Sequence, residues 1–368
     1  MAVPRHASEQ GRHERDRPER DQGCMKATKG DSRTRALLEL LRSRKRLLVL
    51  THTNPDPDSM ASAMGLRLLV DRKLGLAADI ALSGRVMRAE NRELVRECSI
   101  RMLPLAGIDL GRYDAFAVVD TQPGFGHTKI PAGVKIDVVV DHHLPLTDGD
   151  VQDIPHSDVR VDVGATSSMV TGYLMDAGVE VPPDIATALY YGVKTDTADL
   201  SRNASPLDIA AYAFLNERLD RTKLARITMP DVTIEYFRAL RAALNNVRIY
   251  GRVVLCSLGK LEAPEMVAEV ADLLLRMEGK TAVFCGGLVG ATYYVSVRTE
   301  IGERDAYDLI RGALGDGGSF GGHGTVAGGS IPIADDSART LKRLERKLER
   351  NIQKTMGAEG MSVGSLGG

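Results

Sequence analysis

Three apolar runs in the first half of the chain each end on chemically active polar residues. They cover 46–52, 115–120 and 136–143, and they end on a histidine, an aspartate and an Asp-His-His triplet. A segment with apolar residues at helical spacing, 59–72, follows the first run. Strands that alternate with helices predict an α/β fold with a doubly wound parallel sheet. Ligands of such sheets bind beyond the carboxyl ends of the strands, so a site is expected there.

The pattern along the chain predicts two folded regions. Strand and helix patterns resume after a charged helical stretch and continue into a Gly-rich segment and a charged amphipathic helix. The expected parts are a disordered N-terminal segment (1–30), a larger parallel-sheet domain (31–217), a helical linker (218–247), a smaller α/β domain (248–356) and a flexible tail (357–368).

Composition argues against several classes of protein. The formal net charge is −1 and there is no Trp, so neither a whole-protein basic footprint for long nucleic acid nor a broad aromatic platform is expected. The 4 cysteines are scattered and form no CxxC pair, which disfavours structural zinc and a disulfide framework and fits a reducing cytoplasm. No apolar run approaches the roughly 20 residues that span a bilayer. We therefore expect a cytoplasmic protein that binds neither membranes nor long duplexes.

The motif HTNPDPDS (52–59) places one imidazole, His52, close to two carboxylates, Asp56 and Asp58. If this segment is extended, the three side chains face the same side. Clustered carboxylates repel each other unless they are protonated or bound to a cation, and mixed N/O ligands suit Mn²⁺ or a similar divalent ion. The alternative is a turn in which Asp58 or Ser59 caps the helix that follows.

Further candidate ligands follow the other strands. Asp141, His142 and His143 come after a run of valines, and adjacent histidines there need polar partners, although a polar turn is the alternative. Asp120 alone is more often a helix or turn cap, and Asp196 alone reads equally well as a cap. Together with the first motif, these residues suffice for two divalent ions bridged by one carboxylate. Two ions about 3.5–4 Å apart activate a hydroxide and stabilise charge on a phosphoryl group.

In their order, these motifs resemble the DHH phosphoesterase superfamily. The resemblance spans 34–335 and rests on HTNPDPDS, strand-end Asp120, the DHH run and the distal Asp196. That superfamily includes RecJ-like exonucleases, oligoribonuclease/pAp phosphatases, cyclic-dinucleotide phosphodiesterases and family II pyrophosphatases. The resemblance implies a two-metal phosphoesterase with two Mn²⁺ ions per site, for which Mg²⁺ or Co²⁺ can substitute.

The resemblance also implies a role for each site residue. The first ion would be bound by His52, Asp56 and Asp120. The second ion would be bound by Asp58, Asp120, His142 and Asp196, with Asp120 bridging. His143 would act at the reacting phosphate as a proton donor or charge stabiliser. Asp141 would orient the imidazoles without binding an ion itself.

The Gly-rich run GGSFGGHGTVAGG resembles the GGGH-type signature of the DHH-associated domain of RecJ-like and oligoribonuclease-like members. The basic RKKQ-like run of family II pyrophosphatases is absent from the sequence. Gly321 and Gly322 would let backbone N–H groups approach a phosphate, His323 would add a donor, and Arg298 would bind a terminal phosphate or carboxylate. The alternative is a Gly-rich hairpin with Arg298 on an exposed strand face.

The substrate expected from this resemblance is a short oligoribonucleotide, cleaved to 5′-mononucleotides, with pAp 3′-phosphatase activity as an addition. A cyclic-dinucleotide phosphodiesterase and a non-catalytic nucleotide-binding module are the alternatives, and a homodimer stays open. Two departures from the family pattern, at Pro57 with 60–61 and at 197–200, lie beside the expected ligands. They leave the choice of substrate open, and they do not change the expectation of metal binding.

Overall fold

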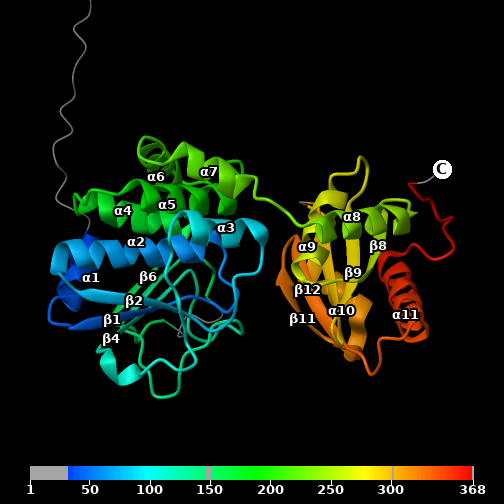
Figure 1. The fold of residues 1–368 in the computed structure, drawn as a ribbon, viewed down its shortest axis with the longest axis horizontal. Coiled ribbons are helices and arrows are strands. Elements are labelled where there is room, and N and C mark those ends of the chain that lie inside the picture. The colour runs from blue at the N-terminus through cyan, green and yellow to red at the C-terminus, as the bar shows by residue number, and fades with distance from the viewer. Residues whose placement is uncertain (1–31, 146–150, 301, 367–368) are drawn as a thin grey trace, which may run out of the picture. The chain divides into compact units, whose positions relative to one another are not determined.

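The computed structural model describes residues 32–145, 151–300 and 302–366 (Figure 1). Contacts divide the chain into two compact units. The first comprises the residues up to Gly84 together with Arg101–Leu219, and the second comprises Arg85–Ile100 together with the residues from Asp220 onward. The expected disordered segment, 1–30, lies outside the described residues.

The first unit is built on a six-stranded sheet in the order β3-β2-β1-β4-β5-β6. Every pairing in it is parallel. The strands are β1 (Arg46–Leu50), β2 (Ala77–Leu82), β3 (Leu103–Pro104), β4 (Ala115–Val119), β5 (Val138–Asp141) and β6 (His156–Val159). The strand order changes direction between β1 and β4, as it does in doubly wound sheets, and the predicted α/β fold is confirmed.

Helices pack over one face of this sheet (Figure 1). They are α1 (Ser32–Leu41), α2 (Pro57–Leu74), α4 (Thr166–Asp176), α5 (Pro183–Asp196) and α6 (Pro206–Asn216). The other face carries a smaller apolar cluster to which loop residues and the 3₁₀ turn η1 (Leu110–Arg112) contribute. The loops after β1 and β4 leave the sheet at the change of direction, which is where the strand-end ligands were expected.

Helix α2 begins at Pro57, inside the motif HTNPDPDS, so the motif is not extended along its whole length. The Asp56 carboxylate accepts a hydrogen bond from Ser59 N at 3.0 Å and caps the helix, and Pro57 occupies its first turn. Asp58 therefore lies on the helix, so the expected shared face of an extended strand is wrong. The expected capping by Asp58 or Ser59 is wrong too, because Asp56 is the cap. The helix ends at Gly75, whose φ of 62° suits glycine.

Gly192 of α5 allows this helix to pack closely on the residues around Asp58. A Cβ at Gly192 would lie 2.4 Å from Ser167 Oγ and 3.1 Å from Asp58 Cα. The Ser167 hydroxyl can rotate, but Ser167 Cβ, also at 3.1 Å, and Asp58 Cα are fixed by the first turns of α4 and α2. The packing of α5 thus sets the position of one candidate ligand.

Gly192→Ala is expected to destabilise the protein by about 1–3 kcal/mol, because overpacking outweighs the gain in helix propensity. Gly172→Ala in α4 is the matched control. The Cβ there would meet only the tip of Leu207 at 3.3 Å, so this variant should gain up to about 1 kcal/mol. Urea unfolding of both variants measures the difference. Equal shifts in the two variants would contradict the close packing at Gly192.

The second unit contains a mixed six-stranded sheet in the order β11-β12-β10-β9-β8-β7. Its strands are β7 (Arg248–Tyr250), β8 (Val253–Lys260), β9 (Ala282–Val289), β10 (Thr292–Thr299), β11 (Ser319–His323) and β12 (Val326–Pro332). Only β8 and β9 pair in parallel among the described strands of this sheet. Its helices are α3 (Ala89–Glu97), α7 (Arg221–Thr228), α8 (Ile234–Asn246), α9 (Glu265–Leu275), α10 (Ala306–Leu314) and α11 (Ala338–Met356), with a 3₁₀ turn η2 (Gly315–Gly317).

Three segments differ from the domain plan drawn from the sequence. Residues 85–100 were expected within the first domain but belong to the second unit. The range 218–247 was expected to be a linker, but its second helix, α8, packs on β8 and contributes Ala243 to a core cluster of the second unit. The tail was expected to be flexible, but Gly364 pairs with Ile249 through two backbone hydrogen bonds of 2.9 and 2.8 Å. In the part of the chain that the structure describes, no helix has the length and apolar character needed to cross a membrane.

Candidate metal centre

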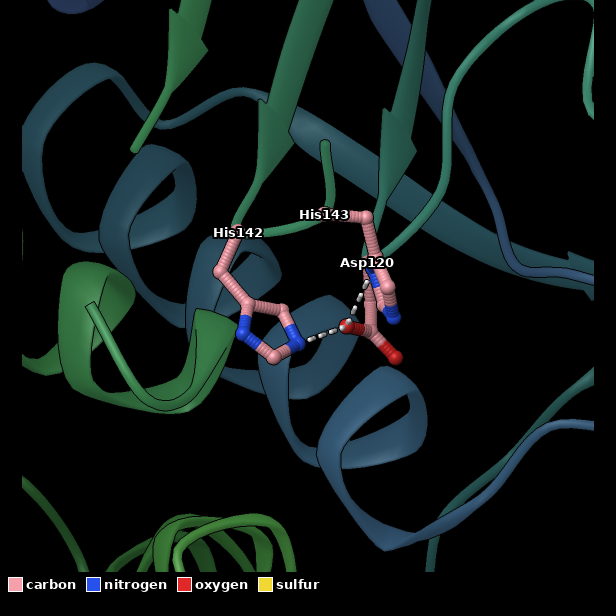
Figure 2. Close-up of side chains that lie close together, drawn as sticks. All are labelled: Asp120, His142 and His143. Carbon is pink, nitrogen blue, oxygen red and sulfur yellow. Dashed lines mark ion pairs between the residues drawn. The ribbon is translucent and has the colours of Figure 1, made fainter. Parts of the chain in front are cut away.

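Three neighbouring strands of the first unit deliver ionisable side chains to one place. His52 follows β1, Asp120 follows β4, and His142 and His143 follow β5. His52 Nε2 lies 3.8 Å from one carboxylate oxygen of Asp120, and His142 Nε2 lies 3.5 Å from the other. Figure 2 shows the rings of His142 and His143 beside the Asp120 carboxylate. Asp120 is thus at the centre of the group.

The candidate ligands form two adjoining clusters. Within each cluster, the ligand atoms lie within 4.8 Å of one another. The members of the first cluster are His52, Asp56 and Asp120, and those of the second are Asp58, His142 and Asp196. Asp120 also groups with His142 and His143. The structure thus brings together the six ligands inferred from the sequence, and their assignment to two ions stays a prediction.

Asp120 holds a conformation that most residues avoid. Its φ is 57°, in the left-handed region, where Asp and Asn are tolerated better than other residues with a Cβ. The side chain is 2% exposed, and Thr166 Oγ1 donates a hydrogen bond to Oδ1 at 3.0 Å. Backbone strain of this kind persists only where the surroundings enforce it, and it is concentrated at functional sites.

Asp58 is held by the start of another helix. The backbone N–H groups of Thr166 and Ser167 each donate to its carboxylate at 2.7 Å, at the N-terminus of α4. The partial positive charge of a helix N-terminus favours a carboxylate there. Burial, and next the charge of Asp196, nevertheless raise the pKa of Asp58 to about 7. The carboxylate oxygens keep lone pairs for a further ligand.

The electrostatics of the cluster fit a bound cation. Burial, and next the charge of Asp58, raise the pKa of Asp120 well above its usual range. Burial lowers the pKa of His142, but the Asp196 carboxylate close to its Nε2 and the charge of Asp58 outweigh this and raise it to about 9. Several buried carboxylates therefore repel one another when they are ionised, and a bound divalent ion would relieve this repulsion.

The imidazole of His142 is oriented as a metal ligand would be. Its Nδ1 lies 3.3 Å from the Val163 carbonyl oxygen, and this contact places the proton on Nδ1. Its Nε2 is buried, has no hydrogen bond, and lies 3.2 Å from Asp196 Oδ2. A lone pair facing carboxylates is repulsive unless a proton or a metal ion lies between them. The donor set therefore fits a divalent ion that accepts nitrogen and oxygen ligands.

Asp141 orients the next imidazole of the DHH run. Its Oδ1 lies 2.8 Å from His143 Nδ1 and accepts from the backbone N–H of His142 at 2.9 Å. This leaves the Nε2 of His143 available, on a side chain that is 38% exposed. The arrangement matches the orienting role that the resemblance implies for Asp141.

Gln122 completes this network, and the sequence analysis missed it. Its Nε2 donates to Asp141 Oδ2 at 2.7 Å and to the His143 carbonyl oxygen at 2.9 Å, and the side chain is fully buried. The residue lies two positions after Asp120, in the loop that leaves β4. Its position beyond a strand end was the only available signal, because the contact to β5 is not visible in the sequence.

Gln122→Ala is expected to lower Mn²⁺-dependent turnover by roughly 10–100-fold, the usual cost of losing an outer partner of a metal site. The physical reason is that Asp141 would lose the donor that fixes it. Gln152→Ala removes an exposed glutamine of the same unit and serves as the matched control. Steady-state kinetics and a Mn²⁺ titration measure the effect. Turnover within about twofold of the wild type would contradict the positioning role.

The same loop brings two further rings to the cluster that the sequence analysis did not single out. The His127 ring lies 5.4 Å from that of His52, and the Phe125 ring lies 6.3 Å from that of His143. The His127 carbonyl oxygen accepts hydrogen bonds from Thr53 N at 2.9 Å and from Thr53 Oγ1 at 2.6 Å. These bonds tie the loops after β1 and β4 together.

Arg298, a predicted phosphate ligand in the second unit, is buried in this structure. It is 5% exposed, its Nε contacts Asp272, and its Nη1 donates to Ser296 Oγ at 2.7 Å. The alternative placement of Arg298 on an exposed strand face is therefore wrong. Its guanidinium is held in one orientation by partners from β10 and α9.

The Gly-rich run forms the β11–β12 hairpin, as the alternative interpretation expected. Gly322 has a φ of 141°, and a Cβ there would lie 2.4 Å from Ala327 Cα, so the pairing of β11 with β12 itself requires glycine. Gly321 has open space around it. His323 ends β11 opposite Val326, and its side chain lies outside the described part. Phosphate binding by this group stays a prediction.

Two parts of the chain match known protein families. Residues 46–193 match the DHH family N-terminal domain, and residues 251–350 match the DHHA1 domain. The chain carries a DHH domain followed by a DHHA1 domain. The predicted resemblance to the DHH phosphoesterases is thereby confirmed. The whole candidate metal centre except Asp196 lies within the matched DHH residues.

Individual proteins are similar to this chain over most of its length. An uncharacterised protein of Methanocaldococcus jannaschii is 35% identical over 329 residues, which is 88% of this chain and 64% of that protein. An A-adding tRNA nucleotidyltransferase of Geobacter sulfurreducens is 25% identical and aligns with 82% of this chain and 34% of its own length. The chain thus spans less than two thirds of both relatives. A solved exopolyphosphatase-related protein from Bacteroides fragilis shares the fold, with a TM-score of 0.70, 16% identity, and coverage of 88% of this chain and 97% of its own.

Proposed function

We propose that this DHH/DHHA1 chain is a Mn²⁺-dependent phosphodiesterase that hydrolyses short oligoribonucleotides to 5′-mononucleotides. The observation that carries the proposal is the pair of adjoining ligand clusters, with Asp120 between them. The two matched domains support phosphoester chemistry. The mixture of imidazole and carboxylate donors favours Mn²⁺, and Mg²⁺ or Co²⁺ are its expected substitutes.

The ligands are proposed to divide between two ions. The first ion would be held by His52, Asp56 and Asp120, and the second by Asp58, Asp120, His142 and Asp196. Such a pair of ions, when bound, supplies a hydroxide at neutral pH and stabilises the charge that develops on a phosphoryl group. The hydrogen bonds from the N-terminus of α4 to Asp58 and the enforced conformation of Asp120 hold these ligands in position for both ions.

His143 is proposed to act at the reacting phosphate. Its Nδ1 is occupied by Asp141 at 2.8 Å, so its Nε2 is free to donate a proton to the oxygen of the leaving nucleotide. The contact with Asp141 fixes the orientation of the imidazole, and Gln122 keeps that carboxylate in place. The same group would stabilise negative charge on the phosphate before the proton moves.

The preference for short substrates is assigned to the second unit. Arg298, Gly321, Gly322 and His323 are proposed to bind a terminal phosphate of the substrate, and pAp would use the same contact for removal of its 3′-phosphate. Arg298 suits this task because its guanidinium binds phosphate in a forked geometry and is already oriented by Ser296. A small nucleotide or short RNA is thus the proposed partner.

The test is a substrate panel with the full chain and added Mn²⁺. Ribonucleotides of two to five residues, pAp, and a cyclic dinucleotide would be incubated at equal phosphate concentration, with a chelator-treated sample as control. We expect 5′-mononucleotides to form from the short RNAs when Mn²⁺ is present and not in the chelator-treated sample. Exclusive turnover of the cyclic dinucleotide would replace the proposal with that alternative. Turnover of none of them, together with nucleotide binding, would favour a regulatory module.

A further inference from the structure

Helix α11 carries an unusual concentration of positive charge for a chain with a net charge of −1. Seven of its side chains are cationic and exposed, and these define the basic face of the helix: Arg339, Lys342, Arg343, Arg346, Lys347, Arg350 and Lys354. None of them makes an ion pair with a described residue. The basic face is therefore not neutralised from within the described chain.

The seven cations share one side of the helix. At about 100° per residue they fall within an arc of roughly 140°, and at 1.5 Å per residue they extend over roughly 22 Å. The opposite side is apolar, and Leu348 and Ile352 are buried in the core of the second unit. Because that apolar side is already packed, α11 cannot insert into a membrane surface as an amphipathic helix does.

The two acidic residues of α11 are engaged on the inner side. Glu345 accepts hydrogen bonds from Ser257 Oγ and from Tyr293 OH, and Glu349 pairs with Arg248 Nη1 at 2.6 Å. Neither carboxylate therefore separates the cations along the basic face. The result is an uninterrupted stripe of positive charge.

A cavity of about 680 Å³ opens beside this stripe. Lys342 and Arg346 of the basic face line it together with the carboxylates of Glu345 and Glu349, and Ser257 and Asn246 add hydrogen-bonding groups. Its volume lies within the range of small-molecule sites, roughly 300–1,000 Å³. Phe284, Tyr293 and Val295 contribute apolar lining. Cationic, polar and apolar groups thus meet where a phosphate and its attached base could be accommodated together.

We propose that the basic face of α11 binds the phosphate backbone of single-stranded RNA and that the adjoining cavity receives one unstacked base. A row of exposed cations complements an extended polyanion. An unstacked base requires a single strand rather than a duplex. An acidic protein partner would satisfy the charges but would leave the cavity without an occupant. The choice of RNA rests on the proposed function, whereas the binding site itself is separate from the metal centre.

Salt dependence of binding tests the proposal directly. A fluorescent 20-nucleotide single-stranded RNA would be titrated with the full chain at several NaCl concentrations, with a chelator present so that the strand stays intact. Each phosphate contact contributes about −0.7 to the slope of log K against log salt for a single strand. The triple variant Arg339→Gln/Arg343→Gln/Arg350→Gln should therefore make the slope shallower by about 2 and weaken binding by at least about tenfold near 0.1 M salt.

A charge-matched variant controls for lost net charge. Arg42→Gln/Arg72→Gln/Lys73→Gln removes three exposed cations of the first unit and should leave the slope unchanged. An equal loss in this control, or an unchanged slope in the α11 variant, would overturn the proposal. So would a duplex of the same sequence that binds as tightly as the single strand. Binding of anionic phospholipid vesicles that depends on α11, without RNA binding, would overturn it as well.

Hydrolysis of a ribodinucleotide separates this inference from the proposed function. The α11 triple variant should hydrolyse the dinucleotide at the wild-type rate, because none of the three arginines belongs to the metal centre. If the wild type hydrolyses no dinucleotide but its RNA affinity still depends on α11, the proposed function fails and the binding site stands. If hydrolysis is normal and α11 has no effect on RNA affinity, the proposed function is supported and the binding site on α11 is refuted.

Discussion

Asp120→Asn should reduce Mn²⁺-dependent hydrolysis by about 10³-fold or more, the scale on which the loss of one key electrostatic group is felt. Asn preserves the shape of the side chain and tolerates the φ of 57°. It removes the carboxylate that lies 3.8 Å from His52 and 3.5 Å from His142, so both proposed ions lose a ligand. Steady-state turnover of a ribodinucleotide measures the loss.

The metal-free form of Asp120→Asn should be at least as stable as the metal-free wild type. Burial, and then the charge of Asp58, raise the pKa of Asp120, so its charge opposes folding when no cation is bound. Asp120→Ala removes the same charge but should be less stable than Asp120→Asn by about 1–2 kcal/mol, because alanine is strained at this φ. Asp153→Asn, an exposed aspartate, is the control. Normal turnover in Asp120→Asn would refute the bridging role.

Addition of Mn²⁺ to chelator-treated protein should raise the unfolding temperature of the first unit alone. All six proposed ligands belong to that unit, so a transition of the second unit serves as an internal control. At a free-ion concentration about 1,000 times Kd, the gain is about 4 kcal/mol, which corresponds to a shift of roughly 10 °C for a unit of this size. Differential scanning calorimetry measures both transitions.

The shift should grow as the pH rises, because the metal must displace protons. Burial and neighbouring carboxylates raise the pKa of Asp58 to about 7 and raise that of Asp120 well above its usual range. Below these values the ligands hold protons, and the ion competes with them less well. Asp120→Asn should lose most of the shift at every pH. A shift that is equal in wild type and variant, or that appears in both units, would argue against the two clusters.

The sequence predicted the strand-end ligands because their signal is local. The runs before His52, Asp120 and Asp141 are buried strands whose continuous apolar character is visible without any partner. In parallel strands the carboxyl ends meet at one edge, so their convergence followed from the fold class. Strand β3 has only two residues, and the sequence HSDV of β6 has a single apolar residue, so neither shows a hydrophobic pattern that could be recognised.

What the sequence did not predict depends on contacts between distant segments. Gln122 matters because β5 lies beside β4, and Thr166 matters because α4 begins next to Asp58. Arg298 sits in an apolar-rich strand, and nothing local shows that Asp272 of α9 would meet it and allow it to be buried. If the motif were extended, Asp56 and Asp58 would share one face, and its local sequence does not exclude that arrangement. Only the helix start at Pro57 separates the two positions.

The distribution of the ligands along the chain has a consequence during synthesis. His52, Asp56 and Asp58 leave the ribosome early, whereas Asp196 stands at the end of α5, the last element of the first unit to supply a ligand. A growing chain therefore has no complete pair of clusters until α5 has emerged and packed on α2. On the proposed assignment, a bound ion would stabilise the first unit only once that unit has folded. An incomplete chain, released early, would bind the ion weakly and be left exposed to proteases.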